Sequence, residues 1–127
     1  MKKESKVRTQ YVDGFLLPVP AKNLSAYRRI SQKAGKIWIE YGALEYRECV
    51  GDDLQTKMGK SFPKLITLKS NETVFFSWIT YKSRTHRDKV NSQVMSDPRL
   101  KDMMDDKKMP FDVKRMSMGG FKIIVDL

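Results

Sequence analysis

The chain has 127 residues, 40% of them hydrophobic and 31% charged, which is typical of one soluble globular domain with one core. No apolar run approaches the roughly 20 residues that a membrane helix needs, and the first ten residues lack the apolar segment of a secretory signal. The single cysteine and single histidine exclude a disulfide framework and a cysteine-rich zinc site, whereas the net charge of +10 would attract an anionic partner.

A basic tail is predicted ahead of the domain. Residues 1–10 carry four basic side chains and one acidic side chain, and we expect this segment to be flexible. The single domain then covers residues 11–127. Its first strand is predicted at Tyr11–Val19 from the alternation of apolar residues, although Asp13 interrupts the apolar face and Gly14 indicates a bulge or a close backbone approach.

A long amphipathic helix is predicted next, at about Asn23–Tyr41. Apolar residues recur there at helical spacing, the first residue is a suitable N-terminal cap, and Gly42 is placed to end the helix. Gly35 costs about 1 kcal/mol relative to alanine inside a helix, so we expect a tight contact at this position. Pro18 and Pro20 are expected to end the preceding strand.

Two further strands follow. The segment Ala43–Val50 carries charged residues on both faces, so we expect it near a sheet edge or beside a polar cavity. A long polar connection comes next, with a short helix or an extra strand turn predicted at Leu65–Leu68. The segment Thr73–Tyr81 is β-branched and aromatic on both faces, which is typical of a strand covered on both sides.

The last third is predicted to contain a helix at Ser83–Met95, a further helical turn at Pro98–Met104 and a strand at about Lys114–Val125. The resulting order, β-α-β-β-α-β, predicts an α+β, ferredoxin-like protomer, an antiparallel sheet with the helices on one face. The other face would expose apolar residues of three strands. We therefore expect two copies to pack sheet against sheet as a two-fold homodimer.

Five blocks carry a resemblance to a known family: YVDGFLLPVP (11–20), GALEYRECV (42–50), VFFSWITYKSRTHRDKVN (74–91), SDPRL (96–100) and MPFDVKRMSMGGFKIIV (109–125). Together they resemble an uncharacterised bacterial family, a domain-of-unknown-function family that includes the YbaA proteins. The resemblance covers nearly the whole chain from Tyr11. It implies a dimeric α/β barrel built from ferredoxin-like protomers, and it transfers no catalytic residue.

Helix Ser83–Met95 carries two candidate sites. His86 titrates near neutrality and its helical spacing turns it toward the sheet, so it is the candidate catalytic residue, with a structural histidine as the alternative. Lys82, Arg84 and Arg87 gather at the start of the helix, where free N–H groups would bind a carboxylate or phosphate. The alternative for this cluster is a solvated basic turn.

A ligand pocket between the first helix and the sheet is predicted from four aromatic residues, with plain aromatic core as the alternative: Trp38, Tyr41, Tyr46 and Trp78. The charged strand residues must be paired or must face a cavity: Asp13, Glu45, Arg47 and Glu48.

These features favour a cytoplasmic homodimer that binds or transforms a small aromatic or anionic metabolite, and they leave open whether it is an enzyme. We expect no metal ion, no organic cofactor and no membrane contact. A nucleic-acid partner is less favoured, because an RNA-binding protein of this topology uses the sheet face that the dimer would cover. A purely structural or regulatory dimer is the remaining alternative.

Overall fold

The computed structural model describes residues 9–127, so the predicted flexible tail lies outside the described residues except for its last two positions. Four strands form one antiparallel sheet: β1 (Tyr11–Pro20), β2 (Glu45–Val50), β3 (Glu72–Tyr81) and β4 (Ser117–Lys122). Their order across the sheet is β2–β3–β1–β4, which confirms the predicted ferredoxin-like α+β fold.

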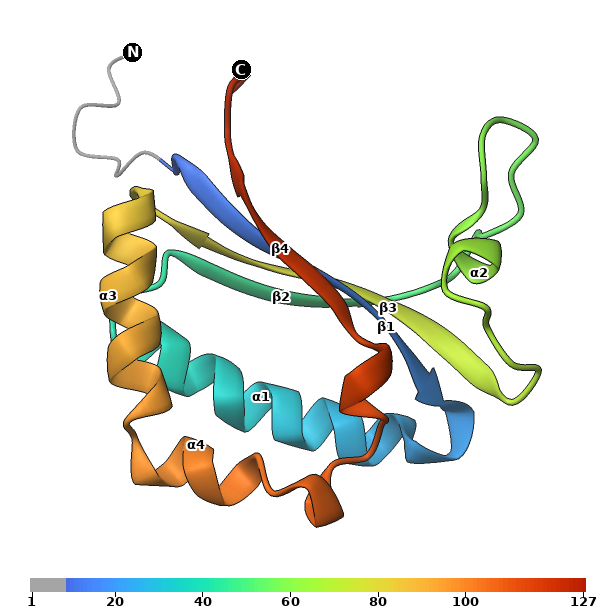
Figure 1. Ribbon diagram of the computed structural model, residues 1–127, viewed down its shortest axis with the longest axis horizontal. Helices are drawn as coiled ribbons and strands as arrows, with labels where there is room; N and C mark the ends of the chain where they lie inside the picture. The colour runs from blue at the N-terminus through green and yellow to red at the C-terminus, as the bar shows by residue number, and fades with distance from the viewer. Residues whose placement is uncertain (1–8) are drawn as a thin grey trace.

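The main helices cover one face of this sheet (Figure 1). Helices α1 (Leu24–Glu40), α3 (Arg84–Met95) and α4 (Pro98–Met103) lie on that side, whereas the one-turn helix α2 (Phe62–Leu65) lies at the far end of the sheet, in the β2–β3 connection. Among the described residues, no helix is long and apolar enough to cross a membrane.

Strand β1 ends at Pro20, as expected of that proline and one residue beyond the predicted Val19, and it contains Pro18. Pro18 lies opposite Val74 of β3, and β4 pairs with β1 only as far as Leu16. A residue without an N–H is tolerated at this point because one edge of β1 has lost its partner strand. Gly14 forms no bulge, since the register runs through it without interruption.

Three other boundaries differ from the prediction. The last strand is only six residues long, because a 3₁₀ turn at Val113–Arg115 occupies its predicted start. The second strand begins two residues later than predicted. The short helix lies slightly ahead of Leu65–Leu68, because Ser61 caps it by accepting a hydrogen bond from the Lys64 N–H and Pro63 stands in its first turn.

Helix α1 is positioned by one close contact and one glycine turn. An alanine Cβ at Gly35 would lie 2.5 Å from Cδ1 of Tyr46, which confirms the predicted tight contact. Gly42 ends the helix with φ of +115°, a conformation that favours glycine. Asn23 directly precedes α1, but its side chain does not form the predicted capping hydrogen bond. It donates instead to the Pro110 carbonyl, at 2.9 Å.

The core consists of two clusters between the helices and the sheet. The larger one joins the start of β1 and the end of β3 to the end of α1 and the second half of α3, and it contains the fully buried Tyr81. The smaller one packs Tyr27 of α1 against Leu17, Val19 and Phe75. The rings of Tyr27 and Phe75 have centroids 4.4 Å apart. Burial of these side chains supplies most of the free energy that holds the helices on this face.

The opposite face of the sheet is apolar and partly open. Phe76 and Phe121 on this face are 43% and 60% exposed, and Trp78 packs against Phe76 with ring centroids 5.9 Å apart. Glu45 and Arg47 on the same face form an ion pair at 3.6 Å. An apolar surface of this kind is typical of a buried interface.

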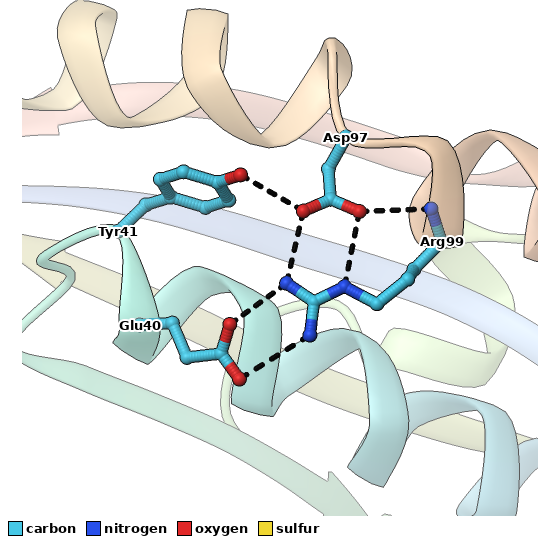
Figure 2. A network of polar contacts seen from close by, with 4 residues as sticks. All are labelled: Glu40, Tyr41, Asp97 and Arg99. Atoms are coloured by element: carbon cyan, nitrogen blue, oxygen red, sulfur yellow. Dashed lines mark hydrogen bonds and ion pairs between the residues drawn. The ribbon is translucent and has the colours of Figure 1, made fainter.

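A polar network fastens the end of α1 to the α3–α4 turn (Figure 2). Arg99 donates to both carboxylate oxygens of Asp97, at 3.1 and 2.9 Å, and to both oxygens of Glu40, at 3.3 and 2.7 Å. The Tyr41 hydroxyl donates to Asp97 at 2.8 Å. Hydrogen bonds from Arg99 hold the pKa of Asp97 well below its usual value. The network is fully paired, so we assign it a structural role.

Candidate functional site

A cavity of about 270 Å³ lies between the helices and the sheet. Strands β1, β2 and β3 form its floor, α1 and α3 form its roof, and the segment that leads into β4 closes one side. Most of the lining is aromatic, aliphatic or sulfur-containing, and five methionines contribute to it: Met95, Met104, Met109, Met116 and Met118. Methionine adapts its shape to a ligand, so this lining fits a small apolar molecule.

One polar end of the cavity is built on Glu48 of β2. The Tyr27 hydroxyl donates to Oε1 of Glu48 at 2.8 Å, and the Tyr46 hydroxyl donates to Oε2 at 3.1 Å. Burial raises the pKa of Glu48 above its usual value, although hydrogen bonds from the tyrosines, Ser77 and Ser31 oppose the shift. Burial, followed by the charge of Glu48, also raises the pKa of both tyrosines, so they are neutral donors at physiological pH.

The other polar end is built on Asp13, which is 5% exposed. Burial raises its pKa, and the Arg87 guanidinium, whose Nε lies 3.6 Å from Oδ1, opposes the shift. Asn91 of α3 accepts hydrogen bonds from Trp38 Nε1 at 3.0 Å and from the Tyr81 hydroxyl at 3.2 Å. The negative charge of Asp13 is therefore compensated within the protomer by the Arg87 cation and by hydrogen bonds with the neutral side chains of Asn91 and Tyr81.

A surface groove reaches the Glu48 end from outside. It runs between α1 and β2, has a volume of about 910 Å³, and shares Tyr27, Ser31, Tyr46 and Glu48 with the interior cavity. Strand β2 is an edge strand, so no further strand covers this side in the protomer. Glu48 and its two tyrosines thus form the wall between the groove and the cavity.

The four aromatic residues predicted to line a pocket separate into two groups. Trp38 and Tyr46 line the cavity, with ring centroids 6.0 Å apart. Tyr41 belongs instead to the polar network at the end of α1. Trp78 borders the cavity through its strand, but its ring packs against Phe76 on the open face. Trp38 and Tyr46 therefore line the cavity, and their role in binding a ligand stays a prediction.

His86 lies at the start of α3, and it is absent from the described residues that line the cavity. Its Nδ1 accepts a hydrogen bond from the Lys82 N–H at 3.0 Å, and its ring lies edge-on to Tyr81. Burial, helped by Lys82 and Lys89, lowers its pKa. This geometry is that of a neutral histidine that holds the strand-to-helix turn.

The basic cluster predicted at the start of α3 is divided. Lys82 and Arg84 are exposed, but Arg87 turns toward the sheet and donates to the Tyr11 hydroxyl at 2.9 Å. Its guanidinium also lies 5.0 Å from the centre of the Tyr11 ring and pairs with Asp13. Arg87 is therefore engaged within the protomer, so the three residues do not present one anion site to solvent.

Sequence reasoning missed Tyr27 and Asn91 as site residues. Tyr27 falls among the apolar residues at helical spacing in the first predicted helix, and no sequence signal singled out Asn91. Glu48 and Asp13 were recognised as charges that had to be paired or face a cavity, and both face the cavity. Among the described residues, no group of three or more metal-ligating side chains is arranged to hold an ion.

The chain is similar to uncharacterised bacterial proteins over most of its length. The family described as "Protein of unknown function (DUF1428)" matches residues 10–113. "Uncharacterized protein YbaA" of Escherichia coli strain K12 is 44% identical over 117 residues, which cover 92% of this chain and 98% of that protein. The protein of the same name from Shigella flexneri is equally similar.

Two solved structures share the fold. A dimeric ferredoxin-like protein from an uncultured marine organism superposes with a TM-score of 0.55 at 10% identity, covering 98% of this chain and 97% of that one. An uncharacterized NIPSNAP domain protein from Burkholderia xenovorans has a TM-score of 0.52 at 13% identity, covering 87% and 91%. At such low identity these similarities concern the fold alone.

Proposed function

The chain belongs to the DUF1428 family of proteins of unknown function, and we propose that it is a homodimer that binds one small, largely apolar molecule in the interior cavity of each protomer. The observation that carries this proposal is the cavity itself, an apolar space with a partly buried carboxylate held by two tyrosines at one end. Convergent polar groups in an otherwise apolar cavity are typical of a ligand site. We place the protein in the cytoplasm as part of the same proposal.

The volume and charge of the cavity limit the ligand. At about 270 Å³ it is close to the small end of known ligand pockets, so it fits a molecule built on one aromatic ring. Asp13 and Glu48 both face the cavity, and carboxylates repel an anion. We therefore propose a neutral or cationic ligand and set aside the anionic metabolite that the sequence also allowed.

The proposed dimer rests on the open sheet face. Phe76 and Phe121 are large apolar side chains on the same face, and both are far more exposed than the core aromatics. A second copy placed there would remove this surface from water and leave the helices of both protomers outside. One structural neighbour is described as a dimeric ferredoxin-like protein, which supports the proposal of a dimer.

Native mass spectrometry of freshly purified protein tests the ligand proposal. We expect a dimer that carries a small adduct, and we expect Ala34→Leu, which fills the cavity, to lose the adduct. Ala21→Leu is the matched control, because Ala21 is exposed outside the cavity. Protein that carries no adduct and binds no member of a single-ring ligand library would contradict the proposal. Copurifying RNA would favour the nucleic-acid alternative.

Sedimentation velocity tests the dimer. Phe76→Glu places a charge on the open sheet face, so we expect it to convert the dimer into monomers. Met58→Glu changes a more exposed apolar residue, 87% exposed in the β2–β3 connection, and should leave the dimer intact. A wild-type protein that sediments as a monomer would refute the packing of two sheets.

A further inference from the structure

We infer that Glu48 is the counter-ion for a protonated amine, so that the site takes a small arylalkyl amine. This inference rests on the proposed function, because it names the chemical class of the ligand that the cavity binds. It follows from a difference between the two carboxylates that face the cavity.

Asp13 already has its cation. The Arg87 guanidinium lies 3.6 Å from Asp13 and pairs with it from the start of α3. Glu48 has no such partner: within residues 9–127, no basic side chain forms an ion pair with it, and its hydrogen-bond donors are the neutral hydroxyls of tyrosine and serine. Glu48 is only partly buried, but a carboxylate withdrawn from water without a cation is still costly, and such a group beside a cavity is a candidate for binding a ligand.

The surroundings of Glu48 suit an ammonium group. Tyr27 and Tyr46 bring aromatic rings beside the carboxylate, and aromatic rings attract cations. They also hold both carboxylate oxygens in place, so the acceptor is oriented before a ligand arrives. The aryl part of the ligand would then occupy the apolar cavity behind Glu48, against Trp38 and the methionines.

The groove between α1 and β2 provides the route to this position. Glu48 faces both the groove and the cavity, so an amine reaches it from solvent without crossing the Asp13 end. The charged residues along the groove are Arg28, Lys36 and Glu40 of α1, and all three are exposed and therefore screened by solvent. From β3, only the neutral Ser77 faces Glu48.

Proton linkage follows from the same arrangement. Burial raises the pKa of Glu48, so the empty site holds a proton more readily than an exposed glutamate would. A bound ammonium group would stabilise the ionised carboxylate and displace that proton. Affinity for an amine should therefore fall as the pH is lowered toward the pKa of Glu48, whereas affinity for a neutral ligand of the same shape should not.

Calorimetric titration with three single-ring probes, benzylamine, benzyl alcohol and phenylacetate, tests the inference. We expect benzylamine to bind about tenfold more tightly than benzyl alcohol, because its ammonium group adds the attraction of opposite charges to the hydrogen bond with Glu48, and we expect phenylacetate to bind least. Glu48→Gln should weaken benzylamine binding much more than benzyl alcohol binding and so remove the preference. Glu45→Gln is the matched control, because Glu45 lies on the same strand and on the opposite face of the sheet.

The outcomes separate the two proposals. If benzyl alcohol binds as tightly as benzylamine, or if Glu48→Gln keeps the preference, the amine inference is wrong although the cavity still binds ligands. If none of the three probes binds, the proposed function fails and the inference fails with it. Should Glu48→Gln not fold, the wild-type comparison at pH 7.5 and pH 5 decides: benzylamine alone should weaken at the lower pH, and equal behaviour of both probes would overturn the inference.

Discussion

Replacing Gly35 with alanine tests how α1 holds the Glu48 end of the cavity. Gly35 is buried in the middle of α1, and an added Cβ would lie 2.5 Å from Cδ1, 2.7 Å from Cε1 and 3.0 Å from Cγ of Tyr46. All three atoms belong to a rigid ring, so the ring as a whole has to move. The cavity behind it offers the space, and this movement would pull the tyrosine hydroxyl away from Glu48.

The expected free energy change combines three contributions. Overpacking of this kind costs about 1–3 kcal/mol. The lost hydrogen bond to a buried carboxylate costs about 1.5–3 kcal/mol more if the hydroxyl finds no new partner. Alanine is favoured over glycine inside a helix by about 1 kcal/mol, which offsets part of the loss. We therefore expect Gly35→Ala to lower the free energy of unfolding by about 1.5–5 kcal/mol.

Urea unfolding of a double-mutant cycle isolates the contact. Tyr46→Ala removes all three ring atoms that the new Cβ would strike. In that background Gly35→Ala should stabilise the protein by about 1 kcal/mol, because only the helix preference of alanine remains. The sign of the Gly35→Ala effect thus depends on residue 46.

The result that would refute this reasoning is an equal effect of Gly35→Ala in both backgrounds. Equal destabilisation would show that α1 itself rejects the substitution, and equal stabilisation would show that Tyr46 moves without cost. Gly14→Ala is a control for the added methyl group, since its Cβ would meet its nearest neighbour at an ordinary 3.8 Å. We expect this control to change stability much less than Gly35→Ala.

Three further predictions concern charge and the histidine. Burial raises the pKa of Glu48 in the folded state, so ionised Glu48 destabilises the fold above that pKa, and this cost vanishes below the unfolded pKa of about 4.3. The stability of Glu48→Gln relative to wild type should therefore increase as the pH rises from 4 to 8. A constant stability difference in urea unfolding would contradict this. Asp97 has a lowered pKa, so the stability that it contributes is present above its unfolded value and is lost as pH falls through the folded one. Arg99→Gln should lower the melting temperature at pH 7 by several degrees and weaken its dependence on acidic pH. Glu40→Gln should have a smaller effect, because Glu40 is 55% exposed. Equal melting-temperature shifts in both variants would be evidence against a polar network centred on Asp97. His86→Ala should leave benzylamine binding unchanged in calorimetry, since His86 does not line the cavity. A large loss of affinity would show that His86 contributes to the site.

Local patterns were sufficient to predict the fold. Period-two alternation marked β1 and β3, helical spacing marked α1, and the order of the elements then left the ferredoxin-like sheet as the expected topology. Errors occurred where a neighbour decided the local structure. Asn23, for example, bonds to a carbonyl 87 residues away instead of capping its own helix.

The candidate site was predicted less completely, because its members are distant in the chain. Trp38 and Tyr46 were identified from residue type, and Glu48 from its position as a charge on a strand. The Tyr46–Glu48 contact joins two residues on the same face of β2, but nothing local indicated that Tyr27 would bind the other oxygen of Glu48, since Tyr27 reaches it only when α1 packs on β2. The orientation of Arg87 toward Asp13 likewise depends on how α3 follows β3.

The sequence by itself determined which segments are helices and strands, which faces are apolar and which family the chain resembles, because these properties depend on side-chain type and short-range spacing. The tertiary structure alone decided which charges are compensated. Arg87 neutralises Asp13, Arg99 holds Asp97, and Glu48 is left among neutral hydroxyls at the edge of a cavity. Charge compensation depends on distance through space and on burial, and residues far apart in the chain supply both.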